Sequence, residues 1–139
     1  MNQYMVPFGE AIMRGFANYC KFTGRASRSE YWWFNLFTFM IAFALEILAA
    51  IFAGAHQYTN SMFSAMFSGF FGVVIMLFGL AVLLPSFGLL FRRLHDTGRS
   101  GWWCLIGLIP YVGSIILIIF CCQKSQPFDN NYGPEPNVF

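Results

Sequence analysis

Three long apolar stretches constrain this chain more than any other feature of its sequence. The longest runs from Ser61 to Phe91 without a charged residue, and the stretches 31–55 and 101–122 are nearly as apolar. A helix needs about 20 mostly apolar residues to cross the hydrocarbon core of a bilayer. Because no stretch alternates in polarity as barrel strands do, each is predicted to span the membrane as a helix.

The composition agrees with a membrane protein and excludes a soluble globule. Of the 139 residues, 58% are hydrophobic and 10% are charged, whereas soluble domains average about 45–50% and about 25%. The same apolar excess excludes a disordered chain. We therefore predict an all-α integral membrane protein of one domain. An N-terminal amphipathic helix (5–20) precedes a small bundle of three transmembrane helices (31–55, 61–91 and 101–122). A polar tail (123–139) follows the bundle.

The N-terminal segment 5–20 has the pattern of an amphipathic helix. Phe8, Ile12 and Phe16 recur at helical spacing, while Glu10 and Arg14 lie elsewhere on the helical wheel. Two interpretations stay open: the helix lies in the membrane interface, or it packs on the bundle.

The distribution of basic residues predicts the orientation in the membrane. Seven of the eight Lys and Arg residues lie before the first apolar stretch or between the second and third: Arg14, Lys21, Arg25, Arg28, Arg92, Arg93 and Arg99. By the positive-inside rule the N-terminus is cytoplasmic and, with three spans, the C-terminus is periplasmic. If the chain turns back at Pro110 as a re-entrant hairpin, the tail is instead cytoplasmic.

Polar residues at the starts of two apolar stretches have helix-capping patterns. Ser27 with Glu30 forms a capping box, and Ser100 is suited to cap the third stretch after a turn at Gly98. Asp96 is the one acid in its loop, so we expect it to pair with an arginine there.

The charged residues around these starts form the first candidate site. They are Arg25, Arg28, Glu30, Arg92, Arg93, His95, Asp96 and Arg99. Clustered arginines suit phosphate recognition, which favours binding of anionic lipid headgroups or of a protein partner. An internal polar network is the structural alternative, and catalysis on lipid headgroups by His95 and Asp96 is a third. Neither a metal, a cofactor nor a nucleic-acid partner is expected.

Glu46 is the one acid inside a predicted span, which makes it a second candidate site. Ser68 and Ser114 are expected at a similar depth, so a protonated Glu46 bonded to a serine is one interpretation. The other is a small transporter or channel, in which a homo-oligomer brings two copies of Glu46 together. Small residues spaced by four on the second stretch allow close helix contacts within one chain or between copies.

The tail residues 129–136 are rich in Asx, Gly and Pro, which is typical of turns. The tail is either an extended polar end or a docking strip with Tyr132 as its anchor.

Several motifs occur in an order that resembles a known family: residues 25–33, 92–103, 109–113 and 131–136. They are similar to the YhaH-like bacterial inner-membrane family, which is named only as domain of unknown function 805. The resemblance implies a small multi-pass protein of the bacterial inner (plasma) membrane, and it implies no activity. One departure is the segment 123–129, where the family usually has glycines.

The leading hypothesis from the sequence is thus a non-enzymatic multi-pass membrane protein. Its arginine-rich cytoplasmic face is expected to bind anionic phospholipid headgroups or a partner.

Overall fold

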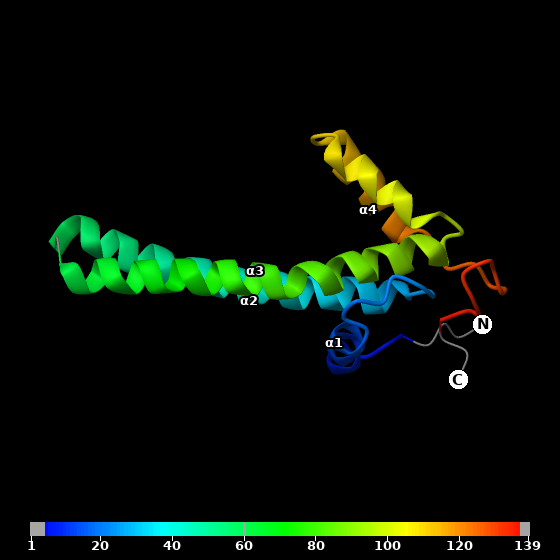
Figure 1. The fold of residues 1–139 in the computed structure, drawn as a ribbon, viewed down its shortest axis with the longest axis horizontal. Coiled ribbons are helices and arrows are strands. Elements are labelled where there is room, and N and C mark those ends of the chain that lie inside the picture. Colours follow the sequence, from blue (N-terminus) through cyan, green and yellow to red (C-terminus); the bar gives the residue numbers. More distant parts are fainter. Residues whose placement is uncertain (1–4, 60, 137–139) are drawn as a thin grey trace. The chain divides into compact units, whose positions relative to one another are not determined.

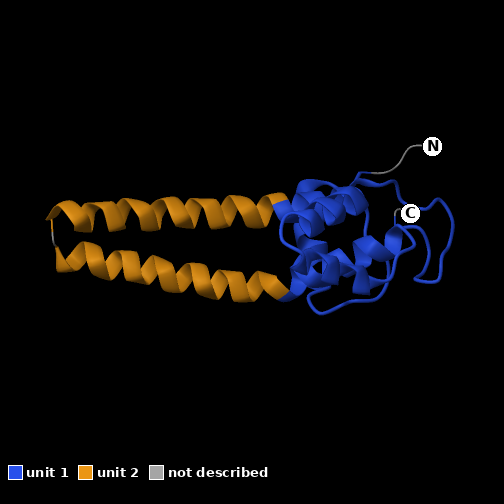
Figure 2. Cartoon of the chain, turned by 90° about the horizontal axis from the view of Figure 1, so that it is seen from above, with its two compact units in different colours: residues 1–35, 84–139 blue, residues 36–83 orange. Residues whose placement is uncertain are grey.

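The computed structural model describes residues 5–59 and 61–136, and every regular element in this part of the chain is helical (Figure 1). The chain divides into two compact units (Figure 2): unit 1 comprises residues 1–35 and 84–139, and unit 2 comprises residues 36–83. The helices in chain order are α1 (Phe8–Ala17), α2 (Arg28–Thr59), α3 (Met62–Asp96), the 3₁₀ helix η1 (Gly101–Leu108) and α4 (Val112–Cys122).

Unit 2 is a pair of helices formed by the second part of α2 and the first part of α3 (Figure 2). The Phe52 ring stacks on the rings of Phe67 and Phe71, at centroid distances of 5.0 and 5.6 Å. Most other large apolar side chains of this unit are exposed. Both α2 and α3 are long and apolar enough to cross a membrane, which confirms two of the three predicted helices as membrane-capable.

The third apolar stretch, 101–122, does not form the single spanning helix expected from the sequence. In unit 1, η1 ends at Leu108, the chain turns, and α4 begins at Val112. Pro110 lacks an N–H to continue the helix, and Tyr111 adopts a φ of 61°. Neither segment is longer than 11 residues. Each is therefore at most about 16 Å long, which is about half the thickness of the hydrocarbon core. The prediction of one continuous helix over this stretch is therefore wrong, and a helical hairpin takes its place.

Close backbone approach holds the two arms of this hairpin together. A Cβ on Gly113 would overlap the carbonyl oxygen of Ile106, so α4 can approach η1 only because glycine is present there. The rings of Trp103 and Phe120 pack edge to face across the hairpin, with centroids 5.7 Å apart.

Helix α1 lies within the predicted N-terminal segment 5–20 and is shorter than that segment. One face of α1 packs on the start of α2: the Phe16 ring lies 5.5 Å from that of Phe34, and the Phe8 ring lies 5.6 Å from that of Trp33. Gly15 is buried against Phe34. The packing interpretation therefore holds for this face, while an interfacial position of the opposite face stays a prediction.

The predicted cap at Ser100 is present, and so is one of the two hydrogen bonds of the capping box, whose Glu30 carboxylate pairs with Arg92. The Ser27 hydroxyl accepts a hydrogen bond from the Glu30 N–H at 3.2 Å, and the Ser100 hydroxyl accepts one from the Trp102 N–H at 3.4 Å. Helix α3 ends in a Schellman motif, because the N–H groups of Gly98 and Arg99 donate to the carbonyls of His95 and Leu94, respectively. Gly98 has the φ of 75° that this motif requires.

The hairpin can be tested with a single methyl group. Gly113→Ala is expected to destabilise the protein by about 1–3 kcal/mol, because the new Cβ cannot fit against the Ile106 carbonyl without moving the backbone. Thermal unfolding in detergent micelles measures the effect. The control is Gly79→Ala in α3, where a Cβ meets no atom within 4 Å; equal unfolding temperatures for both variants would contradict the hairpin.

Candidate functional site

Five buried charged residues of unit 1 come together, and we call them the arginine cluster: Arg25, Glu30, Arg92, Arg93 and Asp96. They come from the connection before α2, the first turn of α2 and the last turns of α3. All five belong to the site predicted from the sequence. The spacing of three between Arg93 and Asp96 places these two on one face of α3.

Asp96 is the acceptor at the centre of the arginine cluster. Its carboxylate is completely buried and pairs with Arg93, which confirms the expected bond to an arginine of the same loop. It also accepts from Arg25, whose Nη2 and Nε lie 2.9 and 3.0 Å from Oδ1. The hydroxyl of Ser125 donates to the other carboxylate oxygen. Every lone pair that burial removes from water thus has a donor close by.

Arg25 binds the tail through main-chain carbonyls. Its Nη2 donates to the carbonyl of Gln126 at 2.6 Å, and its Nη1 donates to those of Phe128 and Gly133 at 2.8 and 3.3 Å. The tail turns between Asn130 and Gly133, whose main chains exchange two hydrogen bonds. One guanidinium therefore fixes three points of a segment that lies about 100 residues further along the chain.

Arg93 caps the C-terminal end of the hairpin. It donates to the carbonyl of Cys121 in the last turn of α4 (3.1 Å) and to that of Gln123, which directly follows α4. It also donates to the carbonyl of Ala26 (3.3 Å). The last carbonyls of a helix have no intrahelical partner, so a buried arginine suits this position. Arg93 thereby joins the end of α4 to the end of α3.

Arg92 pairs with Glu30 but leaves part of its guanidinium unused. Its Nη1 lies 2.9 Å from Oε1 of Glu30, and burial raises the pKa of that carboxyl despite the attraction of Arg92. The Nε and Nη2 atoms of Arg92 are buried and have no hydrogen-bond acceptor within the described part of the chain. A charged donor group in this condition is unusual in a folded protein.

The tail docks through Tyr132 on the end of α3. The Tyr132 ring stacks on the imidazole of His95, with a centroid distance of 3.9 Å and an angle of 2° between the planes. Nδ1 of His95 lies 3.2 Å from the carbonyl oxygen of Gly24, and burial lowers the pKa of His95. The neutral ring then carries its proton on Nδ1, facing that carbonyl. The predicted anchoring role of Tyr132 thus has a contact, and it lies within the same chain.

Arg28 and Arg99, the remaining members of the predicted site, are half-buried outside the arginine cluster. Arg99 donates to Oε1 of Gln123 at 2.6 Å, and its guanidinium carbon lies 4.0 Å above the centre of the Phe120 ring. Arg28 is the first residue of α2.

The predicted hydrogen bond between Glu46 and a serine is absent from the part of the chain described here. Ser68 instead donates to the carbonyl of Ala65 in its own helix, at 3.2 Å, as helical serines often do. Glu46 is exposed on α2 in unit 2, and Ser114 is exposed on α4 in unit 1.

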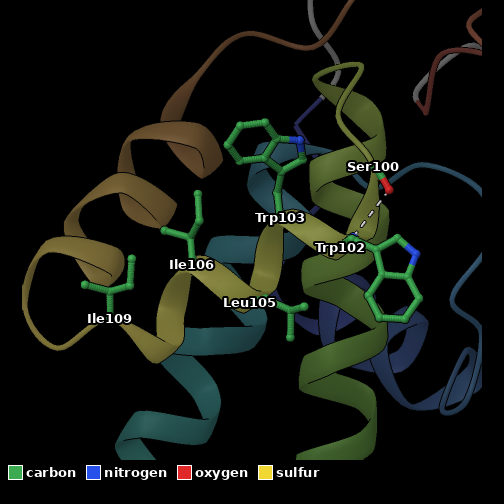
Figure 3. A pocket seen from close by; sticks show the side chains of 6 residues that line it. All are labelled: Ser100, Trp102, Trp103, Leu105, Ile106 and Ile109. Atoms are coloured by element: carbon green, nitrogen blue, oxygen red, sulfur yellow. Dashed lines mark hydrogen bonds between the residues drawn. The ribbon is translucent and has the colours of Figure 1, made fainter.

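Unit 1 also has an apolar hollow of about 410 Å³ along η1 (Figure 3). Six residues line it: Ser100, Trp102, Trp103, Leu105, Ile106 and Ile109. Among the described residues no group of three or more His, Cys, Asp or Glu side chains is arranged to hold a metal ion.

Sequence reasoning missed the partners that the tail contributes. Ser125 contacts Asp96, and the carbonyls of Gln126 and Phe128 contact Arg25. These residues belong to the segment in which the chain departs from the resembling family. Main-chain acceptors leave no mark on side-chain identity, so no signal in the sequence indicated them.

Every regular element of the described residues is helical, and two of the helices are long and apolar enough to cross a membrane, which is the architecture of an all-helical membrane protein. The chain belongs to the family described as "Protein of unknown function (DUF805)", whose model matches residues 19–134. It is 40% identical over 121 residues to the inner membrane protein YhaH of Escherichia coli K12, covering 87% of this chain and 91% of that protein. It is 34% identical over 119 residues to the inner membrane protein YhaI of the same strain, covering 86% and 88%. No solved structure matches the chain.

The arginine cluster can be tested at its central acid. Asp96→Asn is expected to lower the free energy of unfolding by about 3–5 kcal/mol, because two buried guanidinium groups lose their counter-charge. Denaturation in detergent micelles and limited proteolysis of the tail measure the loss. The control is Asp129→Asn, which removes an exposed acid from the same tail and should change stability by less than about 0.5 kcal/mol. A similarly small effect at both positions would show that the cluster does not hold unit 1 together.

Proposed function

We propose that this protein is a non-enzymatic inner-membrane protein whose unit 1 lies at the cytoplasmic surface and binds anionic phospholipid there. One observation carries the proposal: all eight Lys and Arg residues and all four Trp residues belong to unit 1, and residues 36–83 contain none of them. Arginine and tryptophan side chains prefer the headgroup layer of a membrane. Unit 2 then supplies the apolar length for the hydrocarbon core.

The exposure of the tryptophans supports this division. Within unit 1 the side chains of Trp32, Trp33, Trp102 and Trp103 are 40%, 38%, 73% and 45% exposed. Large aromatic rings on the outside of a protein unit are costly in water but favourable at a membrane interface. The hairpin of η1 and α4 also exposes apolar side chains and is too short to cross, so it suits insertion into one leaflet.

The contacts of the tail support placing both ends of the chain on one side. Arg25 lies before α2, and it donates to carbonyls of residues 126, 128 and 133. These groups can meet only on the same face of a bilayer. Combined with the positive-inside rule, the contacts favour a cytoplasmic tail instead of the periplasmic one expected with three spans.

The hydrogen bonds divide the predicted binding residues into two groups. Arg25 and Arg93 are occupied by Asp96 and by main-chain carbonyls, which is the internal-network interpretation of the arginine cluster. We expect lipid contacts from basic residues around it, the exposed Lys124 and the half-buried Arg99. Each basic contact with an anionic surface contributes about 1 kcal/mol.

The topology is tested with reporters fused at two positions. A fluorescent protein that folds only in the cytoplasm should be active after Phe139, and a phosphatase that is active only in the periplasm should be inactive there. The same phosphatase inserted at Asn60, between α2 and α3, should be active and serves as the control. A periplasmic C-terminus would contradict the proposed position of the tail.

Lipid binding is tested by measuring which phospholipids stay with the protein after purification in a mild detergent. The double variant Arg99→Gln, Lys124→Gln should retain less anionic lipid, by about fivefold for each charge removed, because the headgroup phosphates lose their partners. Asp129→Asn changes the charge of the same tail in the opposite direction and should not lower retention. If the wild-type protein shows no enrichment of anionic over zwitterionic lipid, the proposed function is wrong.

A further inference from the structure

A pocket of about 460 Å³ lies in unit 1, between the arginine cluster and the docked tail. Its walls come from α1, the connection to α2, the first turn of α2, the end of α3 and tail residues 132–136. Six of its lining residues carry a formal charge at neutral pH: Arg14, Lys21, Arg25, Glu30, Arg92 and Glu135. Four basic groups against two acids give the walls a formal charge of +2.

Three of these four basic groups form ion pairs within the chain, and the ion pairs use different shares of their hydrogen-bond donors. Arg14 pairs with Glu10 at 2.5 Å. Arg25 pairs with Asp96 and donates hydrogen bonds to carbonyls of the tail. Arg92 pairs with Glu30 through Nη1 alone. Lys21 is exposed and makes no ion pair within the described residues. The positive charge available to a ligand is therefore that of Lys21 and of the unused part of Arg92.

The unused part of Arg92 has the shape of an oxyanion receptor. Arg92 is 4% exposed, its Nη1 is bound to Glu30, and its Nε and Nη2 have no acceptor within the described part of the chain. Nε and Nη2 form one edge of the planar guanidinium group, which can hold two oxygens of a phosphate or carboxylate at once. Because buried donors are almost always satisfied in folded proteins, this edge indicates a missing acceptor.

We propose that this pocket binds a single phosphate group, with two of its oxygens on the Nε and Nη2 edge of Arg92 and a third oxygen facing Lys21. A tetrahedral phosphate has enough oxygens for both contacts, whereas a carboxylate uses both of its oxygens on the arginine. The phosphate belongs either to a phospholipid headgroup or to a soluble phosphate compound. If the phosphate belongs to a lipid headgroup, the inference rests on the proposed function. If it belongs to a soluble compound, the inference is independent of that function.

The test uses the full-length protein in detergent micelles and two probes, inorganic phosphate and short-chain phosphatidic acid. Each is titrated at constant ionic strength, and binding is followed by calorimetry and by the rise in unfolding temperature. We expect saturable binding of the wild-type protein. Lys21→Gln should weaken it about fivefold, since one basic contact is lost, and Arg92→Lys should weaken it at least about tenfold, since a lysine cannot form the two-oxygen contact.

The control is Asp129→Asn, which changes the net charge by one unit at an exposed position of unit 1 outside the pocket and should bind both probes as the wild type does. Arg92→Lys keeps a positive charge beside Glu30, and the exposed Lys21 gives a second variant that does not disturb the buried pair. The site is supported if both probes, or phosphatidic acid alone, bind saturably and the variants show these losses. Binding of phosphatidic acid alone assigns the phosphate to a lipid. No saturable binding overturns it, and so does binding that follows net charge alone, with Asp129→Asn strengthening it as much as Lys21→Gln weakens it. Because anionic lipid retention depends on Arg99 and Lys124, the surface proposal and the pocket can fail independently.

Discussion

The buried carboxylate of Asp96 is the acceptor on which the rest of unit 1 depends. It pairs with an arginine that precedes α2 and with another at the end of α3, and both arginines extend to carbonyls of the hairpin and the tail. Two buried cations are stable together only with this acid between them, because an unpaired buried charge costs several kcal/mol. Segments that are distant in sequence are therefore held together because both arginines need the same carboxylate as their counter-charge.

The same network explains why the hairpin of η1 and α4 returns to its starting point. Arg93 satisfies the free carbonyls at the C-terminal end of α4, and Gly113 lets the two arms approach. A chain that continued across the membrane would leave Arg93 and Arg25 without these acceptors. The hairpin and the arginine cluster thus stabilise each other.

The division of polar and apolar residues between the units also shapes what the protein can do. Unit 2 has one acid, Glu46, and neither lysine nor arginine, so its surface is mainly apolar. Unit 1 combines exposed tryptophans, exposed lysines and an arginine whose bonding capacity is half used. Binding of an anionic group is the chemistry that this combination supports.

The sequence by itself determined the helical membrane class, the two long helices, the caps at Ser27 and Ser100, the turn at Gly98 and the membership of the arginine cluster. These follow from local rules, since apolar length, capping and i, i+3 spacing act within a few residues. Only the tertiary structure decided that residues 101–122 turn back and that the tail lies on the arginines. Hydropathy measures side chains alone, and Pro110 and Gly113 are compatible with a kinked span as well as with a hairpin. The choice between them rests on main-chain carbonyls that accept from Arg25 and Arg93, and any residue type supplies such a carbonyl.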